Sequence, residues 1–338
     1  MKKLNFSMWG KALRTIPRIS KEEWQSLDIV SQWLIATRSA VFIMTAIAGI
    51  IGGLMAWYDG TFLPWNFVAA LIGIVFAHAS NNLINDLIDS KKGIDKGNYY
   101  RSLYGPQTVE HKLLSNAGIA RFIGFSLIIA LLAGAFLIWQ TGMVTFYLMI
   151  IGLFFLLFYT WPLKYIGLGE ITVVIVWGPL MVGGTYFVTS GGEWSWPVAI
   201  VGLVYALGPT SVLFGKHTDK LKEDKAKGVY TLPVILGERN SRWITIVMWG
   251  VQYLLIAWLI FAGYLGIALA VVLLAISKYI GTAKIFSKPR PENEPADLEK
   301  GVWPLYLSAN AFVYNKRFGL LFLLGLIIDL VLVKAGII

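Results

Sequence analysis

Long apolar runs constrain this chain more than any other feature of its sequence. Runs of about 20 residues, the length that crosses the hydrocarbon core of a bilayer, recur from residue 33 to the C-terminus. Hydrophobic residues make up 57% of the 338 positions. Because hydrocarbon offers the backbone no hydrogen-bond partners, a crossing segment must be a helix or part of a closed barrel, and runs without period-two alternation favour helices. We therefore predict an all-α membrane protein.

The apolar runs divide the chain into about nine expected transmembrane helices. We expect residues 1–32 to form a cytoplasmic N-terminal segment and residues 33–338 to form the transmembrane domain. The N-terminal segment contains a capping box, Ser20 with Glu23, and we expect the helix that follows it to lie in the membrane interface. The expected spans are centred on residues 33–57, 65–88, 119–139, 143–160, 169–190, 197–217, 243–262, 265–282 and 319–336.

The basic residues are distributed unevenly between the connections, and this predicts the sidedness of the chain. The formal net charge is +10, but Lys and Arg gather in the N-terminal segment and the even-numbered connections, whereas the odd-numbered connections have none. The positive-inside rule then places the N-terminus and the even connections in the cytoplasm. This pattern favours a membrane partner over nucleic acid. Arg38, near the start of the first span, is expected to extend to the cytoplasmic interface.

A short internal repeat, D-x-x-K-G, follows the second and the sixth spans. Four spans separate its two copies, so both helices run in the same direction and present their acids on the same side of the membrane. We predict two four-helix repeats plus a ninth helix around a central polar cavity. The matched positions are Asp89, Lys92 and Gly93 in the first copy, and Asp224, Lys227 and Gly228 in the second.

The first copy belongs to a polar segment, HASNNLINDLIDSKKGID (residues 78–95), that continues directly from an apolar run. At 100° per residue its polar side chains fall within an arc of roughly 140° on one helix face. An ionised carboxylate facing lipid costs several kcal/mol, so this face is expected to line the bundle interior. Gly93 is expected to end the helix, with Asp95 just beyond it. The face consists of His78, Asn81, Asn82, Asn85, Asp86 and Asp89.

The second copy lies in GKHTDKLKEDKAKG (residues 215–228). On a regular helix Glu223 shares the face of Asp219, whereas Asp224 reaches that face only if the helix is distorted or unwinds. His217, a lone histidine at a helix end, is expected to make hydrogen bonds rather than to act as a base or ligand.

Two carboxylate clusters among lysines and arginines suit one chemistry. Carboxylate and amide oxygens are the hard ligands that Mg²⁺ prefers, and Mg²⁺ in proteins commonly shares its coordination with substrate phosphates. Basic side chains would meet the remaining phosphate oxygens. The alternative, a solvated loop margin, stays open for Asp95 and Glu223. The chain has no Cys, which excludes disulfides, thiolate metal sites and cysteine nucleophiles.

The motifs resemble those of the UbiA-type intramembrane prenyltransferases. NDLIDSKKGID (residues 85–95) resembles their first Asp-rich motif, and DKLKEDKAKG followed by VYTLPVILGE (residues 219–238) resembles the second. The long gap from Asp89 to Asp95, the stretch YTWPLKYIGLGE (residues 159–170) and the pair Gly178–Pro179 are similar to the branch that makes menaquinone precursors, the 1,4-dihydroxy-2-naphthoate polyprenyltransferases. The resemblance covers about residues 30–338.

This resemblance implies roles for individual residues of the chain. It implies that Asn85, Asp89 and Asp95 form the first Mg²⁺-binding group, and that Asp219 forms the second with Glu223 or Asp224. We expect Asp89 and Asp219 to be the catalytic acids. From their positions in the sequence we also expect His78, Asn81 and Tyr159 to support the acids, and the basic residues Lys92, Arg101, Lys164 and Lys216 to bind the diphosphate. The family usually places the two acids of the second motif four residues apart, but Asp219 and Asp224 are five apart. Either Glu223 replaces the later acid, or a π-type bulge restores the geometry.

The expected function is Mg²⁺-dependent transfer of a polyprenyl group from a prenyl diphosphate to an aromatic acceptor. The branch resemblance favours 1,4-dihydroxy-2-naphthoate, with loss of CO₂, in menaquinone biosynthesis. Other acceptors stay open: 4-hydroxybenzoate, homogentisate or a glycerol phosphate lipid. An alternative of another class is a divalent cation transporter, because acids inside a membrane also line ion paths. The clustering of the acids at the cytoplasmic helix ends argues against transport.

Overall fold

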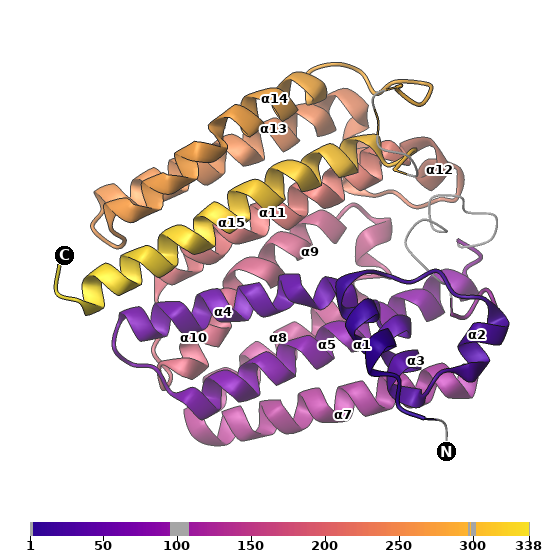
Figure 1. Ribbon diagram of the computed structural model, residues 1–338, viewed down its shortest axis with the longest axis horizontal. Helices are drawn as coiled ribbons and strands as arrows, with labels where there is room; N and C mark the ends of the chain where they lie inside the picture. Colours follow the sequence, from indigo (N-terminus) through magenta and orange to yellow (C-terminus); the bar gives the residue numbers. More distant parts are fainter. Residues whose placement is uncertain (1–2, 95–107, 297, 299–301, 338) are drawn as a thin grey trace. The chain divides into compact units, whose positions relative to one another are not determined.

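A computed structural model of the chain describes residues 3–94, 108–296, 298 and 302–337 (Figure 1). Every regular element among these residues is a helix, and their β-type pairing is confined to an isolated bridge between Ile166 and Tyr230. The chain forms two compact units. Unit 1 consists of Met1–Gly49 and Val68–Trp161, and unit 2 of Ile50–Phe67 and Pro162–Ile338.

Helices α4 and α5 each belong partly to unit 1 and partly to unit 2. The helices of unit 1 begin with three short N-terminal segments. They are α1 (Phe6–Arg14), α2 (Lys21–Ser26), α3 (Ile29–Ala36), η1 (Ser39–Val41), α4 (Phe42–Tyr58), α5 (Pro64–Lys91), α7 (Asn116–Thr141) and α8 (Met143–Phe158).

In unit 2, α9, η3 and α10 follow one another without a gap, and so do η4 and α14. Its elements are η2 (Leu163–Tyr165), α9 (Gly169–Ile175), η3 (Val176–Gly183), α10 (Gly184–Thr189), α11 (Trp196–Asp219), α12 (Leu221–Ala226), α13 (Leu232–Phe261), η4 (Ile267–Ala275), α14 (Ile276–Phe286) and α15 (Tyr306–Lys334).

Seven helices of the described residues are long and apolar enough to cross a membrane. They cover Ser39–Tyr58, Pro64–Lys91, Asn116–Thr141, Gly169–Thr189, Trp196–Asp219, Leu232–Phe261 and Ile267–Phe286. The two other expected spans correspond to α8, which is apolar but has only 16 residues, and to α15, which carries Lys316, Arg317, Asp329 and Lys334. The all-helical, membrane-crossing architecture is therefore confirmed. The total of nine and the arrangement as two four-helix repeats stay predictions.

The first expected span, residues 33–57, is not one helix. Helix α3 ends at Ala36, Arg38 adopts a left-handed conformation with φ 56°, and α4 starts only after the short η1 turn. The expected helix from residue 20 to residue 33 is likewise interrupted. Ser20 caps α2 as predicted, by accepting a hydrogen bond from the Glu23 amide at 3.1 Å. Asp28 then starts a new helix, α3.

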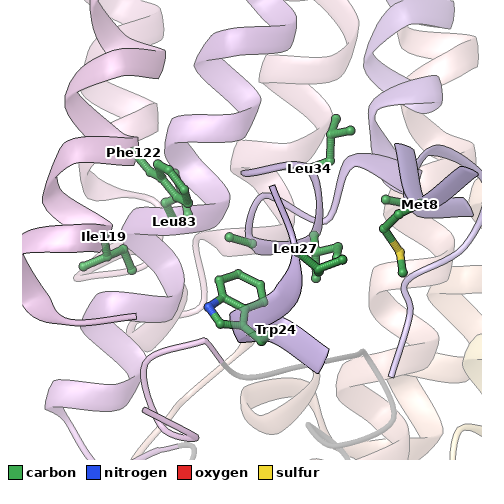
Figure 2. Close-up of a cluster of buried hydrophobic side chains, with 10 residues drawn as sticks. Met8, Trp24, Leu27, Leu34, Leu83, Ile119 and Phe122 are labelled. Carbon is green, nitrogen blue, oxygen red and sulfur yellow. The ribbon is translucent and has the colours of Figure 1, made fainter. Parts of the chain in front are cut away.

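The N-terminal helices pack against α5 and α7 through an apolar cluster (Figure 2). Trp24 and Leu27 meet Leu83 of α5 and Ile119 of α7 in this cluster. Burying these large side chains is the main favourable term that holds short helices to a bundle, because helices of this length are marginal alone. The N-terminal segment is therefore part of unit 1. The buried members are Met8, Ala12, Trp24, Leu27, Leu34, Ile35, Ala36, Leu83, Ile119 and Phe122.

Asp28 joins the N-terminal helices by hydrogen bonds. Its carboxylate accepts the amides of Val30 and Ser31 at 3.0 and 3.1 Å, and the Ser31 hydroxyl at 2.6 Å. It also accepts the Trp9 indole N–H at 3.2 Å and the Asn5 amide at 3.1 Å. Burial raises the pKa of Asp28, but the hydrogen bonds lower it by more. The pKa therefore falls from its usual 3.8 to about 2. The ionised carboxylate is thus the form that holds α1 to α3.

Replacing Asp28 by Asn should lower the free energy of unfolding near neutral pH by about 1–3 kcal/mol, because several donors lose a charged acceptor. The native pKa is below the unfolded one, so the carboxylate stabilises the chain above the unfolded pKa and stops doing so as the pH falls through the native pKa. Thermal unfolding in detergent should therefore show the wild-type advantage shrinking from about pH 5 to about pH 2. An advantage that stays constant over this range would contradict the account.

Helix α11 is central to unit 2, where it packs against α13, α15 and η3 (Figure 1). Glycine allows α11 and η3 to approach each other closely. A Cβ on Gly202 of α11 would lie 2.8 Å from the Gly178 carbonyl oxygen of η3, closer than side chains tolerate. Element η3 is a π-helix that contains Pro179. Proline removes one amide from the helical ladder, which is an identifiable cause of local rewinding. The π-type geometry therefore occurs here and not in the second acidic segment.

Candidate active-site segments

Two of the predicted supporting residues on α5 connect helices within unit 1. The ring Nδ1 of His78 lies 2.7 Å from the hydroxyl of Thr45 in α4. The Asn81 side-chain amide donates to the Leu156 carbonyl of α8 at 2.9 Å. These bonds satisfy polar groups inside an apolar bundle. His78 and Asn81 thus orient α5, which carries the first acidic segment.

The break before α4 is held to the same face of α5. The Arg38 guanidinium forms an ion pair with Asp86 and donates to the Asn82 carbonyl at 3.4 Å. The Asn82 side chain donates to the Thr37 carbonyl at 2.8 Å. A buried carboxylate needs such a partner, because an unpaired charge in a low-dielectric interior is costly. Arg38 therefore contacts α5, and its expected extension to the membrane interface stays a prediction.

Asn85 and Asp89 complete the polar face of α5. The Asn85 side-chain oxygen is buried and accepts no hydrogen bond. Asp89 follows one helical turn later and is only 8% exposed. A buried oxygen without a donor costs free energy unless a ligand satisfies it. An amide oxygen and a carboxylate, one turn apart, fit a hard divalent cation. Two other predicted residues, Asp95 and Arg101, lie outside the described residues.

The helix that carries this pair ends in a Schellman motif. Gly93 has φ +69°, the left-handed conformation that glycine adopts without strain. The Gly93 amide donates to the Ser90 carbonyl at 3.0 Å, and the Ile94 amide donates to the Asp89 carbonyl at 2.9 Å. Gly93 therefore ends α5 as predicted, with Asp89 as the third residue before the helix C-cap.

The second acidic segment ends in the same local structure. Gly228 also has φ +69°. Its amide donates to the Lys225 carbonyl at 3.1 Å, and the Val229 amide donates to the Asp224 carbonyl at 2.9 Å. The two copies of D-x-x-K-G therefore form the same cap. Asp224 is the structural counterpart of Asp89.

A break in the helix settles the geometry of the second segment. Helix α11 ends at Asp219, and Lys220 leaves the helical conformation with φ −112° and ψ 25° before α12 begins. As a result Asp224 is buried, with 4% of its surface exposed, whereas Glu223 is exposed. The five-residue spacing is thus accommodated by a helix break.

Asp219 binds the first turn of α15. One of its carboxylate oxygens accepts the Leu307 amide at 2.9 Å, and the other accepts the Ser308 amide at 2.9 Å. The Arg290 Nε donates to the first oxygen at 3.0 Å. The first amides of a helix have no partner within it, so Asp219 acts as a cap supplied by another helix.

Arg290 is a residue that the sequence analysis missed. Its backbone amide donates to Glu238 at 2.8 Å, and its guanidinium donates to the Pro304 carbonyl at 2.8 Å. The same guanidinium lies 4.4 Å from the ring centroid of Trp303. Arg290 stands in a proline-rich connection without periodicity, where only its charge was visible in the sequence.

A second pair of buried groups lies nearby in the chain. The His217 Nδ1 makes an ion-pair contact with Glu170, and the other Glu170 oxygen accepts the Leu232 amide at 3.2 Å. His217 is thus a hydrogen-bonding residue, as expected. Glu170 lies in the stretch YTWPLKYIGLGE, and its position beside α11 could not be predicted from that motif.

The predicted diphosphate-binding lysines lie near aromatic rings or helix ends. The Lys92 ammonium lies 4.8 Å from the ring centroid of Trp161, and the Lys164 ammonium lies 5.6 Å from that of Tyr165. Lys216 occupies the last turn of α11. Tyr159, predicted to support the acids, is the C-cap of α8.

Comparison with known proteins identifies the family of the chain. The model of the UbiA prenyltransferase family matches residues 42–310. The chain is 25% identical over 271 residues to UbiA prenyltransferase domain-containing protein 1 of Mus musculus, covering 76% of this chain and 78% of that protein. It is 28% identical over 230 residues to 1,4-dihydroxy-2-naphthoate octaprenyltransferase of Escherichia coli (strain K12), covering 64% and 72%.

Solved structures show the same fold. A UbiA homolog from Aeropyrum pernix K1 in its apo form superposes with a TM-score of 0.64 at 17% identity, covering 86% of this chain and 98% of that one. A UbiA homolog from Archaeoglobus fulgidus bound to DMAPP and Mg²⁺ gives a TM-score of 0.56 at 15% identity, with the same coverage. The apolar helices and the fold describe an integral membrane protein with several spans. Because the family model matches most of its length, this chain belongs to the UbiA prenyltransferase family and is an enzyme of the prenyl-transferring class.

Proposed function

We propose that this enzyme transfers a polyprenyl group from a prenyl diphosphate to an aromatic acceptor, with 1,4-dihydroxy-2-naphthoate as the first candidate. The observation that carries the proposal is the pair at the end of α5 in a chain of this family: a buried Asn85 side-chain oxygen that accepts no hydrogen bond, and the buried Asp89 one turn later. The choice of acceptor is supported by the similarity to the octaprenyltransferase of Escherichia coli and by the motif resemblance.

Asn85 and Asp89, with Asp95, are the proposed Mg²⁺ ligands. The fit rests on the chemistry of the donors and on the Asn85 oxygen that accepts no hydrogen bond. Bound Mg²⁺ neutralises the charge that develops on a diphosphate leaving group. His78, Asn81 and the Arg38–Asp86 pair act indirectly, because they fix α5 and so preset the direction of the ligands.

The proposed reaction replaces the carboxylate of the acceptor by the prenyl group of the donor. The allylic C–O bond of the donor breaks, and the diphosphate leaves with the bonding electrons. The ring carbon of the acceptor forms a new C–C bond to the prenyl carbon, and its carboxylate leaves as CO₂. Lys92, Arg101, Lys164 and Lys216 are the proposed partners of the diphosphate oxygens, since ammonium and guanidinium groups form charge-assisted hydrogen bonds with phosphates.

The distribution of basic residues supports a cytoplasmic site. The D-x-x-K-G copies and their lysines fall in connections that the positive-inside rule assigns to the cytoplasm. We propose that the N-terminus and the reaction lie on this side, and that the prenyl tail extends among the apolar helices.

Mass spectrometry of reaction products tests the proposed function. Purified protein is incubated with Mg²⁺, a polyprenyl diphosphate and, separately, dihydroxynaphthoate, 4-hydroxybenzoate, homogentisate and a glycerol phosphate lipid. The expected product has the mass of prenylated dihydroxynaphthoate less CO₂ and forms only with the metal. A prenylated product of another acceptor would correct the substrate. The proposal fails if no acceptor is prenylated, and divalent cation flux into liposomes without turnover would then favour a transporter.

A further inference from the structure

We propose that the second acidic segment binds a phosphate group through Lys220 and holds no metal ion of its own. The proposal rests on the proposed function, which it deepens by assigning the way in which this segment meets a prenyl diphosphate. It replaces the expectation that Asp219, Glu223 and Asp224 are metal ligands.

The two acidic segments end in matching helix caps. Asp89 and Asp224 occupy the same position in two Schellman motifs of the same hydrogen-bond pattern. The residue four positions earlier is Asn85 in the first copy and Lys220 in the second. The first copy therefore presents an oxygen acceptor where the second presents an ammonium group. An oxygen acceptor suits a cation, whereas an ammonium suits an anion.

Lys220 forms an ion pair with Asp224. The Lys220 ammonium lies 2.9 Å from one Asp224 oxygen, and the Lys220 side chain is only 14% exposed. The other Asp224 oxygen is buried and accepts no hydrogen bond. A divalent cation bound to Asp224 would lie beside a fixed positive charge and would be repelled by it. The ammonium thus takes the place of a metal, and its remaining N–H groups can donate to a phosphate.

The other buried acids near the second segment in unit 2 also have partners. Asp219 is engaged by Arg290 and by the first turn of α15. Glu170 pairs with His217. The pairing in this region therefore leaves no set of carboxylates arranged for Mg²⁺.

The two segments differ in net charge. Residues 215–228 contain five lysines against three acids, whereas residues 78–95 contain three acids against two lysines. The segments are opposite in sign although they share a cap. The first suits a divalent cation, and the second suits the anionic phosphate itself.

Metal stoichiometry and pyrophosphate binding test this inference on the full chain in detergent. Mn²⁺ electron paramagnetic resonance, with inorganic pyrophosphate present, should find a single Mn²⁺ per chain. Lys220→Met should weaken pyrophosphate binding by about tenfold or more in calorimetry, because a charge-assisted hydrogen bond is lost. Lys220→Arg should restore most of the affinity. Lys222→Met removes an exposed lysine of the same segment and the same charge, so it is the matched control and should lose much less affinity than Lys220→Met.

Two results would overturn the inference: two Mn²⁺ ions per chain in the wild type, or wild-type pyrophosphate affinity in Lys220→Met. The metal count uses the unmodified protein, so it decides even if a variant fails to fold. Failure of the proposed function is distinguishable. A wild type that binds one Mn²⁺ and pyrophosphate through Lys220, but prenylates no acceptor, refutes the function and leaves the phosphate site standing.

Discussion

Replacing Asp219 by Ala is expected to lower the free energy of unfolding by about 3–5 kcal/mol, the cost of removing one partner from a buried ion pair. The Arg290 guanidinium would lose its acceptor, and the Leu307 and Ser308 amides at the start of α15 would lose theirs. Since Asp219 is separated from these residues by 71 to 89 positions, its loss should release the connection before α15. Denaturant or thermal unfolding in detergent measures the effect.

Two control variants sharpen this experiment. Asp219→Asn keeps one acceptor oxygen and should lose clearly less stability than Asp219→Ala. Glu223→Ala removes an exposed acid from the same segment and should lose clearly less stability than Asp219→Ala. If Asp219→Ala unfolds as the wild type does but has lost Mg²⁺-dependent turnover, Asp219 is a metal ligand after all.

Replacing Asp89 by Asn should lower the rate of Mg²⁺-dependent prenyl transfer by about 100-fold or more, because the site loses the charge that would hold the metal against the leaving group. The local cap of α5 should persist. The Schellman cap at Gly93 uses the backbone carbonyl of residue 89, which the substitution keeps. Product formation at a series of Mg²⁺ concentrations, together with thermal unfolding, separates the two effects.

Lys91→Ala is the matched control for Asp89, because Lys91 is an exposed residue of the last turn of the same helix. It should keep wild-type turnover. Full Mg²⁺-dependent activity in Asp89→Asn would show that the first segment does not hold the metal, and the assignment of Asn85 would fail with it.

Local signals in the sequence predicted most of the helices. Apolar runs gave the positions of α5, α7 and α11 to within a few residues, because the length that crosses a bilayer leaves little freedom. The helix N-cap at Ser20 and the glycine end of α5 were confirmed, since a side-chain cap or a left-handed glycine acts over four or five residues. The first span failed as one helix because its break depends on a distant partner, Asp86.

The two acidic segments were likewise predictable only in their local structure. The D-x-x-K-G pattern was enough to predict that two helices end alike, and the backbone of this motif has the same hydrogen bonds in both places. Which acids already have partners depends on the packing of the helices: Asp86 pairs with Arg38, and Asp219 binds Arg290 and the start of α15. Hydrogen bonds and ion pairs between residues far apart in the chain depend on how helices pack. A periodicity records the face on which an acid lies, but not the charge that packing places beside it.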